Sequence, residues 1–263
     1  MKFSIFILTS FLLCSCASTE SSSKIEKAEI YYNQGTSYLI DKQYTSALDY
    51  LLKAQELNPK EPKILTNLGM AYFFKGQEDQ ARKLFLKALD YDPKYSDARN
   101  NLASLYVRQK KYIDAEREYK VVAEDLVYPN QFRTYYNLGY IFYIKSDFKI
   151  AKSYLLRSIQ ENENHCPAHF LLGEIYLKQH EYKEAYNKYL DASKGTCFND
   201  PAPHYYQAIA LEKNGEYEKA LKKLSEMTEK FKKSEYSSLV NKEINKIQEL
   251  QQQNENRETE KNF

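Results

Sequence analysis

Apolar residues recur along most of this chain at spacings of three and four residues, with polar residues between them. Leu65, Leu68 and Tyr72 form one such stripe. This spacing places the apolar side chains on one face of an amphipathic helix. Short polar segments such as Lys75-Gly76-Gln77 separate successive stripes and indicate turns. The pattern predicts an all-α protein, with helices joined in pairs.

The helices repeat with a period of 34 residues, interrupted by small insertions before the fourth and sixth units. In each unit a small residue is followed by an alanine twelve positions later. These pairs are Gly35 and Ala47, Gly69 and Ala81, Ala103 and Ala115, Gly139 and Ala151, Gly173 and Ala185, and Ala208 and Ala220. A small side chain at such a position lets two helices approach closely. A lone unit cannot bury its apolar face, so the period predicts a stack of units.

The period and its small residues resemble the tetratricopeptide repeat, a helix–turn–helix unit of that length. The resemblance implies a right-handed superhelical solenoid of six repeats. We expect these repeats at 28–61, 62–95, 96–129, 132–165, 166–199 and 201–234. After them, 236–250 carries Leu239, Val240, Ile244, Ile247 and Leu250 at helical spacing, which predicts a capping helix. The remaining segment, 251–263, is expected to be a frayed polar tail.

The N-terminus has the pattern of an export signal. Residues 1–15 contain one lysine and a short apolar run, followed by small residues. Leu13-Cys14-Ser15-Cys16 resembles the bacterial lipobox, so we expect cleavage after Ser15 and a lipid on Cys16. Residues 16–27 would then include a flexible polar tether, and Ala17 implies an outer-membrane, periplasm-facing location by resemblance to Gram-negative lipoproteins. The alternatives are an ordinary secreted protein and a short uncleaved anchor.

Composition narrows the function classes. The net charge is +2 and both signs are interspersed, which argues against a nucleic-acid partner. The chain has seven glycines, mostly at repeat positions, and lacks a phosphate loop, a nucleophile elbow and a zinc-protease motif. We therefore expect neither an enzyme nor a bound cofactor, metal or small-molecule substrate, but a protein-binding module.

Cys166 and Cys197 stand near the two ends of the fifth unit. Antiparallel pairing of its helices would bring these ends together, within reach of a disulfide that an oxidising compartment permits. Two free thiols are the alternative. A metal site is a third interpretation, because His165, His169 and His204 are close in sequence, but their spacing matches no metal-binding signature.

The first helices of stacked repeats line a concave surface, where such proteins bind partners. By resemblance to the repeat family, certain positions of each unit point into that groove. In the last three units these positions carry mostly aromatic side chains edged by a few charges, a composition typical of binding hot spots. The expected groove residues are Arg133, Tyr136, Tyr140, Tyr143, Phe170, Glu174 and Tyr205, with Glu212 at the edge. The alternative is that these rings only pack between repeats.

Six repeats, a lipobox and a cysteine pair bracketing the fifth repeat resemble the type IV pilus biogenesis and stability lipoproteins, a family often called PilF, PilW or Tgl. The resemblance implies a pilotin, an outer-membrane lipoprotein that helps the pilus secretin reach that membrane and multimerise. It also implies a disulfide within the repeat array. The main alternative is a lipoprotein scaffold for peptidoglycan enzymes or for outer-membrane protein assembly.

Overall fold

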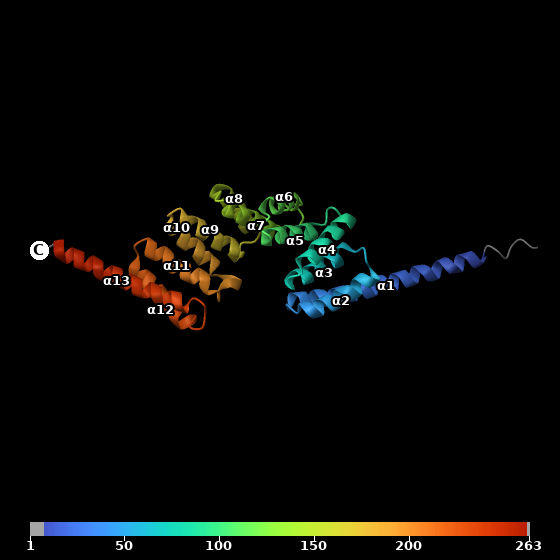
Figure 1. The fold of residues 1–263 in the computed structure, drawn as a ribbon, viewed down its shortest axis with the longest axis horizontal. Helices are drawn as coiled ribbons and strands as arrows, with labels where there is room; N and C mark the ends of the chain where they lie inside the picture. The colour runs from blue at the N-terminus through green and yellow to red at the C-terminus, as the bar shows by residue number, and fades with distance from the viewer. Residues whose placement is uncertain (1–7, 262–263) are drawn as a thin grey trace, which may run out of the picture. The chain divides into compact units, whose positions relative to one another are not determined.

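The computed structural model describes the backbone of residues 8–261 and the side chains of residues 22–253. Within these residues every regular element is a helix, and no strand is present (Figure 1). The elements are α1 (Leu8–Ile40), α2 (Tyr44–Leu57), α3 (Pro62–Phe74), α4 (Glu78–Tyr91), α5 (Ser96–Arg108), α6 (Tyr112–Ala123), α7 (Gln131–Ile144), α8 (Phe148–Glu161), α9 (Cys166–Lys178), α10 (Tyr182–Ala192), the 3-10 helix η1 (Gly195–Cys197), α11 (Pro201–Lys213), α12 (Tyr217–Lys230) and α13 (Ser237–Lys261). The predicted all-α repeat fold is confirmed.

A tight turn joins the two helices of each pair, and one residue in every such turn has a positive φ. At Gly76 the backbone N–H bonds to the carbonyl of Phe73, and the next N–H, that of Gln77, bonds to Tyr72. These bonds satisfy carbonyls that the end of α3 would otherwise leave unpaired. The corresponding turn residues are Lys42, Gly76, Lys110, Ser146, His180 and Gly215.

In the four repeats whose small residue is a glycine, that glycine lies against a large side chain of the second helix. A Cβ added at Gly173 would lie 2.6 Å from a ring carbon of Tyr189, and one at Gly69 would lie 2.6 Å from Phe85. Both rings are fully buried. Close approach of the paired helices therefore depends on the missing side chain, as the sequence pattern predicted.

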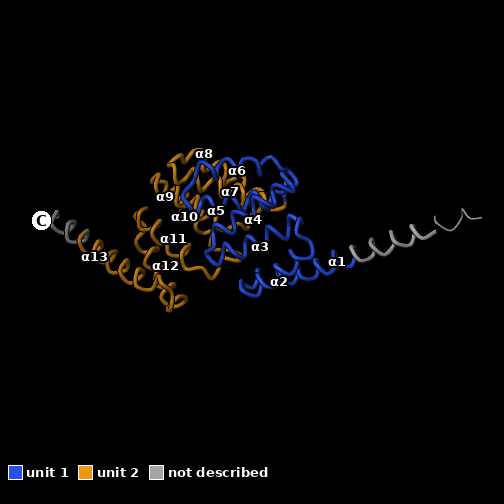
Figure 2. Tube along the Cα trace, turned by 45° about the vertical axis from the view of Figure 1, so that its right-hand side comes forward, with its two compact units in different colours: residues 1–128 blue, residues 129–263 orange. Residues whose placement is uncertain are grey.

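The chain divides into two compact units, one ending at Tyr128 and the other beginning at Pro129 (Figure 2). The first contains α1–α6, and the second contains α7–α13. Each unit has its own buried clusters between neighbouring helices, such as Phe85 with Leu102 in the first and Leu155 with Leu172 in the second. The features described below as a candidate site lie entirely in the second unit.

Helix α13 covers the last repeat. Val240 and Ile247 are buried in one cluster with Leu224 of α12. The ammonium of Lys246 lies 3.0 Å from the carboxylate of Glu212, a residue of α11 that is only 6% exposed. This helix thus shields an apolar face that would otherwise meet water.

The last helix extends further than expected. The helix expected over 236–250 continues through 251–261, which we expected to fray. This continuation contains neither proline nor glycine and consists largely of Gln, Glu, Lys and Arg, which have good helix propensity. Its first residue is also tied back, because the amide of Gln251 donates to the Glu218 carboxylate at 2.6 Å.

The N-terminal tether also differs from expectation. Residues 22–27 are exposed but helical, as part of α1. No proline or glycine precedes Gly35, so nothing in the sequence stops the helix from extending toward the N-terminus. Residues 1–7 and the side chain of Cys16 lie outside the described residues. Among the helices that are described, none combines the length and apolar character required to span a membrane.

Candidate functional site

A groove of about 390 Å³ opens in the second unit, between α7, α9 and the start of α11. Five of the expected groove residues line it together, namely Tyr136, Tyr140, Tyr143, Phe170 and Glu174. Its other lining residues are Cys166, Pro167, Leu171, Cys197, Asp200, Ala202 and Pro203. The lining is therefore mainly apolar and aromatic, with two carboxylates, a composition suited to holding a ligand by burial and orienting it by a few polar contacts.

The spacing of the aromatic side chains explains why they share one wall. Tyr136, Tyr140 and Tyr143 are four and three residues apart on α7, so they lie along one helical stripe. Phe170 and Glu174 have the same relation on α9. The centroid of the Phe170 ring lies 5.4 Å from that of the Tyr189 ring, and this contact holds the Phe170 ring in place.

The carboxylate of Glu174 is held by two phenols. The hydroxyl of Tyr189 donates to Oε1 at 2.8 Å, and that of Tyr143 lies 3.5 Å from Oε2. Burial is the main cause that raises the pKa of Tyr143 to about 12 and the pKa of Tyr189 well above the ordinary tyrosine value; the nearby Glu174 charge adds to both. Both phenols therefore remain protonated donors at neutral pH. The carboxylate is pre-oriented before any ligand arrives.

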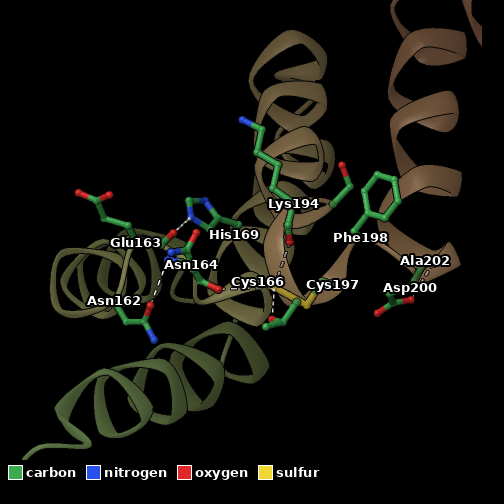
Figure 3. Close-up of a disulfide and its surroundings, with 12 residues drawn as sticks. Asn162, Glu163, Asn164, Cys166, His169, Lys194, Cys197, Phe198, Asp200 and Ala202 are labelled. Atoms are coloured by element: carbon green, nitrogen blue, oxygen red, sulfur yellow. Dashed lines mark hydrogen bonds between the residues drawn. A yellow bond between two sulfur atoms is a disulfide. The ribbon is translucent and has the colours of Figure 1, made fainter.

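A cystine forms one edge of the groove. The sulfurs of Cys166 and Cys197 are bonded, with the two Cα atoms 6.3 Å apart (Figure 3). This bond joins the start of α9 to η1 in the loop after α10. The loop also carries Asp200, whose carboxylate accepts the backbone N–H of Ala202 at 2.9 Å and so caps α11.

Two of the expected groove residues do not line the cavity. Arg133 is exposed near the start of α7, with its guanidinium 5.5 Å from the ring of Phe132. Tyr205 instead packs against Tyr236, with the ring centroids 5.3 Å apart. Glu212, expected at the groove's edge, is buried against α13. The cap follows the sixth repeat directly, so it covers positions that remain open in the fourth and fifth.

Each histidine named in the alternative interpretation as a metal site has a hydrogen-bond partner of its own. The ring nitrogens bond separately, His165 to the Ser158 hydroxyl at 2.9 Å, His169 to the Glu163 carbonyl at 2.9 Å, and His204 to the Phe198 carbonyl at 3.1 Å. Over the described residues no three His, Cys, Asp or Glu side chains converge as a metal site would require. These rings serve packing and local hydrogen bonding.

Sequence reasoning missed the groove residues that come from outside the aromatic positions. Pro167 and Pro203 line the cavity from the first turns of α9 and α11. Proline is common in the first turn of a helix, so the sequence indicates a helix start at these residues and not a groove. We expected the disulfide as a link within the fifth repeat. We did not expect it to line the groove.

Comparison with known families identifies the repeats. Models described as tetratricopeptide repeat match residues 28–61, 62–95, 84–117 and 132–165. These matches identify tetratricopeptide repeats in those segments, and the helix pairs and turns described above have the same all-α repeat fold. Such repeats bind protein partners in a groove. No curated protein sequence matches the chain significantly.

Solved structures with the same fold include PilF of Pseudomonas aeruginosa, which is 20% identical, with a TM-score of 0.73. That similarity covers 84% of this chain and 99% of PilF. PilW, described as a widely conserved type IV pilus biogenesis factor, is 18% identical over 81% of this chain and 97% of its own, also with a TM-score of 0.73. YrrB, described as having an unusual peptide-binding site, is 21% identical over 73% of this chain and 97% of its own, with a TM-score of 0.55. At these identities the similarity establishes the fold.

Proposed function

We propose that this protein is a non-catalytic lipoprotein of type IV pilus biogenesis, a pilotin that assists outer-membrane localisation and multimerisation of the secretin. The observation that carries the proposal is the similarity to PilF and PilW, which covers 84% and 81% of this chain and 99% and 97% of the two relatives. Here the similarity takes in almost the full length of PilF and of PilW, so the extent of the repeat array corresponds as well as the single repeat.

The groove supplies the binding surface for this role. Tyr136, Tyr140, Tyr143 and Phe170 offer rigid rings that lose little conformational entropy when a partner covers them. A cavity of about 390 Å³ has room for a few side chains of a bound segment, not for a folded domain. The partner would therefore insert an extended segment or one face of a helix.

The lipid supplies the location. A diacylated and N-acylated Cys16 would attach the solenoid stably, because each buried methylene contributes about 0.8 kcal/mol. In this proposal the groove selects the partner while the acyl chains keep it at the outer membrane, facing the periplasm.

The test is a deletion strain assayed for heat-resistant secretin multimers, together with a pull-down of the lipidated protein from its own envelope. We expect the multimers to disappear and the secretin to be recovered with the wild-type protein. A Cys16→Ala variant should keep its helicity but leave the outer-membrane fraction. Secretin rings that still assemble, with peptidoglycan enzymes or a β-barrel assembly machine captured instead, would replace the pilotin role with that of an envelope scaffold.

A further inference from the structure

The charged side chains that line the groove are all acidic. Its lining residues include two carboxylates, Glu174 and Asp200, and neither a lysine nor an arginine. Asp200 is already engaged as the N-terminal cap of α11. Glu174 accepts hydrogen bonds from two neutral phenols, and among the described residues no ion pair joins its carboxylate to a basic side chain. It is therefore a partly buried, pre-oriented negative charge without a counter-ion.

The nearest basic side chain on the same helix does not neutralise this charge. Lys178 lies one turn further along α9, and its ammonium lies over the ring of Tyr143, 5.8 Å from the ring centroid. That placement shows that a cation can approach the face of Tyr143, which also donates toward Glu174. A cation entering from the groove would meet both the carboxylate and aromatic faces.

The aromatic surroundings favour a guanidinium over an ammonium. Tyr140, Tyr143 and Phe170 line the same cavity as Glu174. A planar guanidinium is weakly hydrated, stacks on aromatic rings and donates two parallel hydrogen bonds to one carboxylate, whereas an ammonium is a compact and strongly hydrated charge. The remaining lining, including Pro167, Leu171 and Pro203, fits apolar side chains on either side of the charged one.

We propose that the groove takes a short apolar segment of a partner protein that carries one arginine, whose guanidinium pairs with Glu174. This inference rests on the proposed function in so far as the site binds a protein segment. It adds the chemistry that selects the segment, and it applies whichever envelope protein supplies it.

The test uses a library of random peptides displayed on phage, selected on the immobilised full chain and counter-selected on a Glu174→Gln variant. Glutamine keeps the size of the side chain and an oxygen that accepts from Tyr189, so the fold should be retained. The matched control is Glu184→Gln, which makes the same charge change at an exposed position of α10 outside the groove. We expect wild type and the control to enrich peptides with arginine between apolar residues.

An enriched peptide is then measured in a double-mutant cycle against its arginine-to-glutamine counterpart. Replacing either charge should weaken binding by about tenfold or more, and replacing the second after the first should add little. Enriched peptides without an arginine, equal binding to wild type and Glu174→Gln, or no enrichment at all would overturn the inference. The secretin assay is independent, so a selective groove in a strain that still assembles secretin would refute only the pilotin role.

Discussion

Reducing the Cys166–Cys197 disulfide tests how much this bond, at the edge of the groove, stabilises the second unit. The bond links residues 31 positions apart, so it closes a loop made of α9, α10 and η1. In the loop-closure model, a cross-link of this span lowers the entropy of the unfolded chain by an amount worth about 3.7 kcal/mol at room temperature. We expect reduction to lower the free energy of unfolding of the second unit by about that amount.

The assay is urea unfolding followed by circular dichroism, with and without reductant, and hydrogen exchange resolved over α9 and α10. With a denaturant slope of about 2.5 kcal/mol/M, the midpoint should fall by about 1.5 M urea. A Cys166→Ala, Cys197→Ala double variant is the control, because reductant should not change its stability. A shift below about 1 kcal/mol at unchanged slope would show that the bond does not restrict the unfolded chain as the loop-closure model requires.

Three further predictions concern single features of the second unit. Gly173→Ala should displace the Tyr189 ring and destabilise the protein by about 1–2 kcal/mol, because overpacking outweighs the helix propensity that alanine adds. Thermal unfolding measures this loss of stability. Burial and, second, the nearby Arg133 charge lower the pKa of His165 to about 4. Between pH 4 and about 6.5 the unfolded chain therefore binds more protons than the folded protein. The free energy of unfolding should fall as the pH is lowered through this range. Tyr140→Ala combined with Phe170→Ala should weaken partner binding while helicity stays constant.

Each of these has an outcome that would contradict it. Equal or higher stability of Gly173→Ala would mean that the Tyr189 ring moves at no cost. Unfolding midpoints that do not change between pH 6.5 and 4, or that change equally in a His165→Gln variant, would exclude His165 as the source. Full affinity in the Tyr140 and Phe170 double variant would place the binding site outside the groove.

The repeat fold could be predicted from sequence because its causes are local and periodic. Helical stripes, turn residues and small residues at fixed offsets act within a single unit, so Gly69 and Gly173 identify the same packing contact in different repeats. Tyr136 and Phe170 were placed in the groove by the resemblance to the repeat family, whose groove positions recur in every unit. The extents of α1 and α13 were misjudged because polar residues carry no apolar period, although nothing in them breaks a helix.

The sequence by itself determined the repeating unit, the helix pairs and the aromatic character of one wall of the groove. Only the tertiary structure decided which of those aromatic positions remain open. Tyr205 packs against Tyr236, directly before α13, while Tyr140 and Phe170 of the fourth and fifth repeats line the cavity. It also decided that Glu174 is held by Tyr189 and that a cystine edges the groove. Periodicity reports which face of a helix is buried, whereas the neighbours of that face depend on contacts between residues far apart in the chain.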